Sequence, residues 1–159
     1  MTNKYLVVFD TVALVQSTIS PTGAAAKCFD YLERGEISVA VGRATLKEVQ
    51  NVLSRPQIRQ RFPHVTDAKV AWLVDFLLDE GIYLRTVPKH FTYPRDPKDE
   101  PLLNLAIEVK ANYLISRDND LLDLMDWHKE EGREFQKRFR FLKIVTPEEF
   151  LQVVEQPAP

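Results

Sequence analysis

Two aspartates follow apolar runs in this chain, and their position has a chemical consequence. Asp10 comes directly after residues 5–9, and Asp118 follows residues 113–116 closely. Short runs rich in β-branched and aromatic residues are typical of buried strands. In an open parallel sheet, the carboxyl ends of the strands form the edge where ligands bind. Two carboxylates delivered to one edge repel each other unless a positive charge lies between them, so the pattern predicts an oxygen-ligated divalent cation.

Two further acids are predicted to reach the same edge from the starts of helices. Glu48 is flanked by Val49, Val52 and Leu53 on a helical face that should point toward the sheet. Asp99 shares its helical face with the apolar residues of the segment 102–106, so it should also point inward.

Each acid also has a purely structural interpretation. Asp10 is a candidate turn residue that caps the next segment, and Asp118 is a good helix start. Glu48 matches a capping box that begins at Thr45, and an aspartate such as Asp99 is ordinary near a helix start. The functional interpretation therefore depends on all four acids meeting at one place.

Together the acids suit one or two magnesium or manganese ions. Two ions roughly 4 Å apart activate a water and stabilise a leaving oxygen in phosphodiester cleavage. We expect Asp96 to be solvated or to support the ligands from behind. Arg117, beside Asp118, is a candidate contact for a substrate phosphate, and its structural alternative is an ion pair that neutralises the acids.

The elements that would position these residues alternate between strand and helix. Such alternation predicts a mostly parallel sheet of about five strands, covered by helices on both faces in three α/β/α layers. Capping and turn signals stand at Gly35, Thr66 and Thr146. The expected strands are residues 5–9, 37–41, 82–87, 112–116 and 140–145, and the expected helices are 22–34, 45–53, 66–81, 99–111, one from 121 and one from 146.

The length, composition and net charge of the chain limit the class of protein. The chain has 159 residues, of which 45% are hydrophobic, so one domain with a full core is expected over residues 1–155, with a frayed tail at 156–159. The net charge of -2 argues against a strongly basic nucleic-acid binder but allows a local basic groove. A lone cysteine and the lack of a long apolar run or signal peptide predict a cytoplasmic protein with no membrane association.

One locally basic segment has two interpretations, and two other activities lack the acids that they require. Residues 127–143 are locally basic with interleaved aromatics, which suits either an RNA-contacting arm or, as we prefer, a solvated linker or hairpin. A phosphoacceptor domain requires an acid after the third strand, where Pro88 follows Val87 instead. A phosphatase with an aspartyl nucleophile requires an acid at position 12, where Val12 stands.

The chain resembles the PIN domain family, in particular its toxins of toxin–antitoxin pairs. The matching stretches are residues 7–11 (VVFDT), 48–56 (EVQNVLSRP), 96–106 (DPKDEPLLNLA), 111–122 (ANYLISRDNDLL) and 144–151 (IVTPEEFL). The resemblance implies a metal-dependent ribonuclease with an RNA substrate and a cognate antitoxin. Carried over by motif, the family's acids fall on Asp10, Glu48, Asp99 and Asp118, with Asp120 as an accessory metal ligand. A symmetric dimer is the default expectation for oligomeric state.

One departure from the family pattern lies at position 12. The family usually has Asp-Thr-Asn where this chain has Asp10, Thr11 and Val12. An asparagine amide can orient a site by hydrogen bonding, and a valine side chain cannot. Thr11 keeps a hydroxyl that can support the ligands. The departure leaves open an alternative function, in which the fold binds RNA or a protein partner with weakened catalysis.

Overall fold

A five-stranded sheet forms the centre of the structure, and every pair of neighbouring strands is parallel. The computed structural model describes residues 4–156. The spatial order of the strands is β3-β2-β1-β4-β5. The strands are β1 (Leu6–Phe9), β2 (Ser38–Gly42), β3 (Ile82–Leu84), β4 (Tyr113–Ile115) and β5 (Lys143–Val145).

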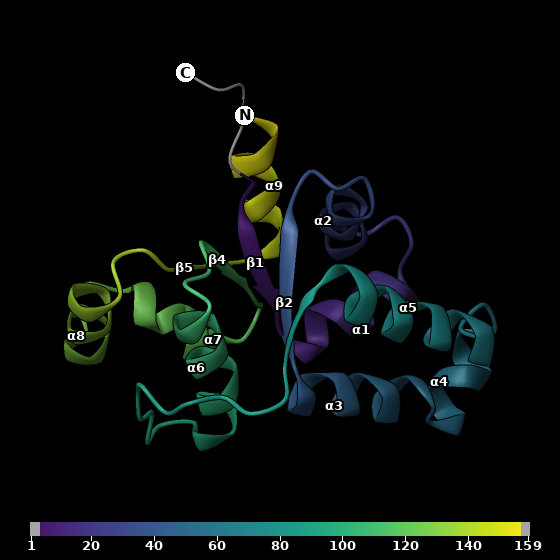
Figure 1. Cartoon of the computed structure of the whole chain (residues 1–159), viewed down its shortest axis with the longest axis horizontal. Coiled ribbons are helices and arrows are strands. Elements are labelled where there is room, and N and C mark those ends of the chain that lie inside the picture. Colours follow the sequence, from purple (N-terminus) through teal and green to yellow (C-terminus); the bar gives the residue numbers. More distant parts are fainter. Residues whose placement is uncertain (1–3, 157–159) are drawn as a thin grey trace.

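Helices cover both faces of this sheet, which confirms the three-layer α/β/α architecture (Figure 1). Alternate residues of β1 serve the two cores, because Val7 and Phe9 face one layer and Val8 faces the other. The first layer contains α1 (Thr11–Ile19), α2 (Ala24–Glu33), α3 (Arg43–Leu53), α4 (Pro56–Arg61), α5 (Asp67–Glu80) and α9 (Pro147–Glu155). The second contains α6 (Glu100–Glu108), α7 (Asn119–Leu122) and α8 (Glu130–Arg138).

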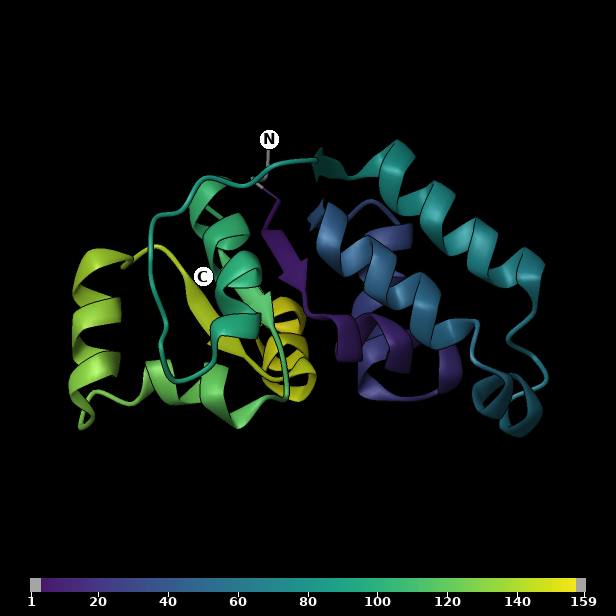
Figure 2. The same cartoon turned by 90° about the horizontal axis from the view of Figure 1, so that it is seen from below.

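The strand order places a topological switch point beside the central strand β1. After β1 the chain adds β2 and β3 on one side, and it later crosses to add β4 and β5 on the other. In open parallel sheets, ligands bind in the crevice outside the carboxyl ends of the strands at such a point. Figure 2 shows the two groups of helices diverging on either side of the central strands. The fold therefore favours a site where β1 and β4 end.

Several local signals are confirmed. Thr66 caps α5 by accepting a hydrogen bond from the backbone N–H of Lys69, and Gly35 has the predicted positive φ of 75° after α2. Thr146 and Glu149 form both hydrogen bonds of a capping box at the start of α9. Each of these signals is local in sequence, because a cap depends on residues within one turn of the helix end.

Other expectations about the elements were wrong. Helix α1 was not predicted, because its apolar residues 12–15 are followed by the polar residues 16–18, so the two kinds do not alternate with a helical period. The segment expected to be a linker or hairpin contains α8, which buries Phe135 beside the buried Phe139 that caps its end. Strands β3 and β5 are shorter than predicted, and α6 ends at Glu108 because the chain turns through a positive φ of 53° at Lys110.

No helix among residues 4–156 is long and apolar enough to cross a membrane. Of the tail predicted at 156–159, only Gln156, which ends α9, belongs to the described residues, and the rest lies outside them.

Candidate metal centre

A cleft of about 660 Å³ opens at the carboxyl ends of β1 and β4. We call it the acidic cleft, because five carboxylates line it. They come from the residue after β1, from α3, from the loop and the 3-10 turn before α6, and from the segment after β4. These residues are Asp10, Glu48, Asp96, Asp99 and Asp118. The four acids singled out from the sequence therefore meet in one cleft, together with Asp96.

Parallel pairing of β1 with β4 explains why Asp10 and Asp118 meet. Phe9 pairs with Ile115, and the backbone N–H of Asp10 donates to the Ile115 carbonyl at 3.1 Å. Ser116 then lies between the two acids. Its hydroxyl donates to Asp10 Oδ2 at 2.5 Å and accepts from the Asp118 N–H at 3.0 Å. The serine therefore fixes both acidic residues at the strand ends.

Asp10 combines a structural role with its place in the cleft. Its Oδ1 accepts from the Ala13 N–H at 2.7 Å, so it caps α1 as the structural interpretation proposed. Asp10 is only 7% exposed, and this burial raises the pKa of its carboxyl above the usual range. The hydrogen bonds from Ser116 and Ala13 oppose the rise, while the charges of Asp118 and Glu48 add to it.

Glu48 reaches the cleft from the second turn of α3. The helix begins at Arg43 after the N-cap Gly42, so the predicted capping box between Thr45 and Glu48 does not form. The side chain is freed for another partner, and Glu48 Oε2 accepts from the Thr11 hydroxyl at 3.1 Å. Glu48 is the most exposed of the five acids, which places it at the mouth of the cleft.

The tightest group of carboxylates is formed by Asp96, Asp99 and Asp118. One oxygen from each of these residues lies within 4.8 Å of the others. Asp99 Oδ2 is buried and has no hydrogen-bond partner among the described residues. Burial raises the pKa of Asp99 to about 8, and the negative charges of Asp118 and Asp96 contribute to the rise.

The donors of this group fit a hard divalent cation. A buried, unpartnered oxygen is costly, and it is stabilised when a ligand supplies the missing partner. All the candidate donors are carboxylate oxygens, which magnesium and manganese prefer, and none is a thiolate or imidazole. A cation bound between the three acids would relieve both their mutual repulsion and the unpaired state of Asp99 Oδ2.

Two residues predicted from the sequence have other partners in the structure. Asp120 Oδ1 lies 2.9 Å from Arg95 Nε, and the residue does not line the acidic cleft. Arg117 does line the cleft, but its guanidinium forms a two-pronged ion pair with Glu148 at 2.5 and 2.6 Å. That ion pair joins the segment after β4 to α9, and the negative charges of Glu148 and Asp10 both raise the pKa of Arg117.

Sequence reasoning missed Ser116 and undervalued Asp96. Ser116 is fully buried, and its position two residues before Asp118 was the available signal. Asp96 was expected to be solvated or to support the ligands from behind, but the 3-10 turn Pro97–Asp99 folds it back beside Asp99 into the close group of carboxylates. The Asp99 N–H donates to the Asp96 carbonyl at 3.1 Å within this turn. A contact made by such a tight turn has no helical or strand periodicity to predict it.

The sequence match agrees with this geometry. Residues 6–120, well over half of the chain, match the PIN domain family. The chain belongs to the PIN domain family. No curated protein matches its sequence. The PIN domain is a nuclease-type fold, and the matched range includes all five acids of the cleft and Ser116.

Position 12, where the resemblance predicts an asparagine, lies in this cleft. Val12 lies in the first turn of α1, is 54% exposed and lines the acidic cleft beside Thr11. An exposed valine in a polar cleft contributes little to folding. Its position is therefore one where a polar side chain would fit without disturbing the core.

Proposed function

We propose that this PIN domain, over residues 1–155, is a divalent-metal-dependent endoribonuclease. The observation that carries the proposal is the group formed by Asp96, Asp99 and Asp118, in which a buried carboxylate oxygen has no partner among the described residues. Its location outside the carboxyl ends of β1 and β4 is where a parallel sheet places a ligand site.

Asp96, Asp99 and Asp118 would hold the metal, and Asp10 and Glu48 would supply further carboxylate ligands from the wall of the same cleft. Bound magnesium or manganese supplies the positive charge that activates a water and stabilises negative charge on a phosphate. Ser116 keeps Asp10 oriented by its hydrogen bond, and Thr11 orients Glu48. Asp120 would act as an accessory ligand only if it left Arg95.

Single-stranded or looped RNA is the substrate class that suits this cleft. Duplex recognition relies on shape and on contacts across a groove, whereas unpaired strands can enter a narrow cleft. A phosphodiester chain is also the anion that a metal-loaded acidic cleft would attract. We propose a cytoplasmic toxin of a toxin–antitoxin pair as the biological role, with a cognate antitoxin and a homodimer as partners, on the resemblance of the motifs alone.

Cleavage assays test the proposal directly. Wild-type protein should cut unstructured RNA in the presence of magnesium or manganese and should stop in EDTA. Asp10→Asn should be inactive, although asparagine keeps the capping ability at the start of α1. Asp75→Asn, which removes an exposed acid of α5, is the matched control and should cleave normally. Cleavage that persists in EDTA or in Asp10→Asn would refute the proposal.

A second function is favoured by Val12 alone. A PIN domain that binds RNA or a protein partner with weak or absent catalysis would keep the acidic cleft and the fold. This alternative predicts RNA binding by wild-type protein without metal-dependent cleavage.

A further inference from the structure

A second cavity opens directly beside the acidic cleft. Its volume is about 390 Å³, and it lies between the start of α3, the segment after β3 and the start of α6. Ala44, Thr45 and Pro101 line both cavities. The two cavities therefore share one rim, and an extended chain lying in one can continue into the other.

The charge of this second cavity is opposite to that of the acidic cleft. Arg43, Arg85 and Lys89 line it, and all three are exposed; we call it the basic pocket. Its one carboxylate, Glu100, lies 3.9 Å from Lys89 Nζ and also accepts from the Tyr93 N–H at 2.9 Å. Among residues 4–156, neither arginine has a carboxylate within ion-pair distance.

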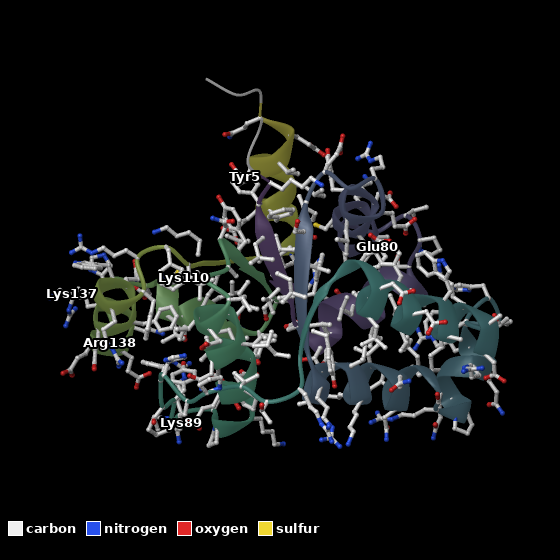
Figure 3. All side chains as sticks on the ribbon, in the orientation of Figure 1. Tyr5, Glu80, Lys89, Lys110, Lys137 and Arg138 are labelled. Carbon is white, nitrogen blue, oxygen red and sulfur yellow. The ribbon has the colours of Figure 1, made fainter. Side chains whose placement is uncertain are left out.

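This local charge does not follow from the composition of the chain, whose net charge is -2. Figure 3 shows Lys89 on the segment that crosses the lower end of the molecule, toward which the carboxyl ends of β1 and β2 point. The start of α3 adds positive potential to the same pocket, because its N-cap Gly42 has no side chain to accept from the free N–H groups.

We propose that the basic pocket is a phosphate-binding subsite for the RNA strand. In this arrangement Arg43, Arg85 and Lys89 hold the backbone next to the nucleotide that lies over the acidic cleft. Guanidinium groups match the oxygens of a phosphate, and a positively charged groove that follows the backbone is how proteins bind single strands without reading sequence. The inference rests on the proposed ribonuclease function, which it deepens by assigning the path of the substrate.

RNA suits the two cavities better than an acidic protein segment does. With a metal bound, the acidic cleft attracts anionic oxygens, and a phosphodiester chain carries such an oxygen on every nucleotide. A phosphodiester chain can bind in both cavities at once, because one phosphate would contact the metal site while its neighbour contacts the cationic side chains of the basic pocket. An acidic peptide can do the same only where its Asp and Glu side chains are spaced to reach both cavities, whereas the charge of an RNA backbone is continuous.

Binding rather than cleavage tests the subsite. The full-length Asp10→Asn protein is titrated onto a fluorescein-labelled single-stranded oligouridylate, and the dissociation constant is measured by anisotropy over a range of salt. Replacing Arg43, Arg85 and Lys89 by glutamine should weaken binding about tenfold. The slope of log K against log salt should become shallower by about 2, since each lost phosphate contact on a single strand removes about 0.7.

The matched control carries Lys27→Gln, Lys110→Gln and Lys143→Gln, which remove the same charge from exposed positions outside both cavities. Lys110 and Lys143 stand at the opposite, amino ends of β4 and β5, and Lys110 lies away from Lys89 in Figure 3. The control should keep both the affinity and the salt slope. Arg85→Gln alone should give about a third of the change in slope, which provides a second test if the triple variant folds poorly.

Each outcome separates the subsite from the ribonuclease function. Equal loss of binding in the two triple variants would overturn the subsite, even if wild-type protein cleaves RNA. Selective loss in the pocket variant without any cleavage by wild type would support the subsite and refute the ribonuclease proposal. Displacement of the RNA by polyglutamate at the same concentration as by unlabelled oligouridylate would overturn the assignment to RNA and favour an acidic protein segment.

Discussion

The hydroxyl of Ser116 donates a hydrogen bond to Asp10 Oδ2 at 2.5 Å, in a place where both residues are buried. This contact joins the ends of β4 and β1 and holds a carboxylate that burial disfavours. The same hydroxyl accepts from the Asp118 N–H, so one side chain positions two acids of the cleft.

Ser116→Ala should therefore weaken both the fold and the metal site. Leaving the buried Asp10 oxygen without its donor should lower the free energy of unfolding by about 1–3 kcal/mol. Loss of the orienting hydrogen bond should weaken manganese binding by about tenfold to a hundredfold. Urea denaturation and calorimetric titration measure the two effects.

Ser17→Ala, which loses a hydrogen bond to the Leu14 carbonyl on α1, should leave manganese affinity unchanged. Equal affinities for Ser116→Ala and wild type would contradict the positioning role.

Divalent metal should stabilise the folded protein. Binding to the native state adds about 2.7 kcal/mol when the free ion is at a hundredfold excess over its dissociation constant. Thermal melts in EDTA and in manganese should therefore differ in midpoint for wild type and for the control Asp75→Asn. The difference should disappear in Asp118→Asn, which lacks one carboxylate of the close group. A midpoint that does not respond to saturating metal would remove the basis for a shared cation site.

Asp99→Asn should make the metal-free protein more stable at neutral and alkaline pH. The folded-state pKa of about 8 lies above the ordinary value of 3.8, so protons are released on unfolding. This stabilising contribution is complete below pH 3.8 and is lost as pH rises through 8. In EDTA, the wild-type melting midpoint should accordingly fall across this range more steeply than that of Asp99→Asn. Asp75→Asn should retain the wild-type slope, and parallel curves for Asp99→Asn and wild type would show that Asp99 is not the titrating group.

The sequence predicts some contacts of this site and not others. The difference is the separation in sequence between the residues that make each contact. Asp10 and Asp118 follow short apolar runs, and parallel pairing alone brings the ends of their strands together. The caps at Thr66 and Thr146 are equally local. By contrast, the ion pair between Arg117 and Glu148 spans 31 positions and depends on how α9 docks beside β4. No pattern near Arg117 indicates that partner.

The helices that the sequence did not predict have a common cause. Helix α1 has its apolar residues in one block, 12–15, followed by polar residues 16–18, and its contacts with α2 and α3 stabilise it without a helical sequence period. Helix α8 has the opposite composition, with Phe135 as the only large apolar side chain among many charged residues. Tertiary packing decides both helices, and it overrides the weak local preference of each segment.

Asp96→Asn and Asp120→Asn should differ in their effect on metal binding. Asp96 contributes an oxygen to the close group with Asp99 and Asp118, whereas Asp120 is paired with Arg95. Asp96→Asn should therefore weaken manganese binding by about tenfold or more, and Asp120→Asn should change it little. Titration calorimetry compares the two variants directly. A larger loss in Asp120→Asn would mean that Asp120 leaves Arg95 and ligates the metal, as its sequence motif suggested.

Val12→Asn should raise ribonuclease activity or leave it unchanged. Val12 is 54% exposed and lines the acidic cleft at the first turn of α1, so an asparagine there meets no core residue and gains an amide that can hydrogen bond. The expected change in the free energy of unfolding is within about 0.5 kcal/mol, as for other surface substitutions. The measurement is the rate of cleavage of unstructured RNA by wild type, Val12→Asn and the volume-matched control Val12→Thr, all at saturating manganese.

Similar rates for all three would show that position 12 does not limit catalysis. Cleavage by Val12→Asn without any by wild type or Val12→Thr would instead identify a nuclease that lost its activity at this residue and kept its fold. Slower cleavage by Val12→Asn than by wild type would contradict the prediction and indicate that this cleft depends on an apolar wall beside Thr11.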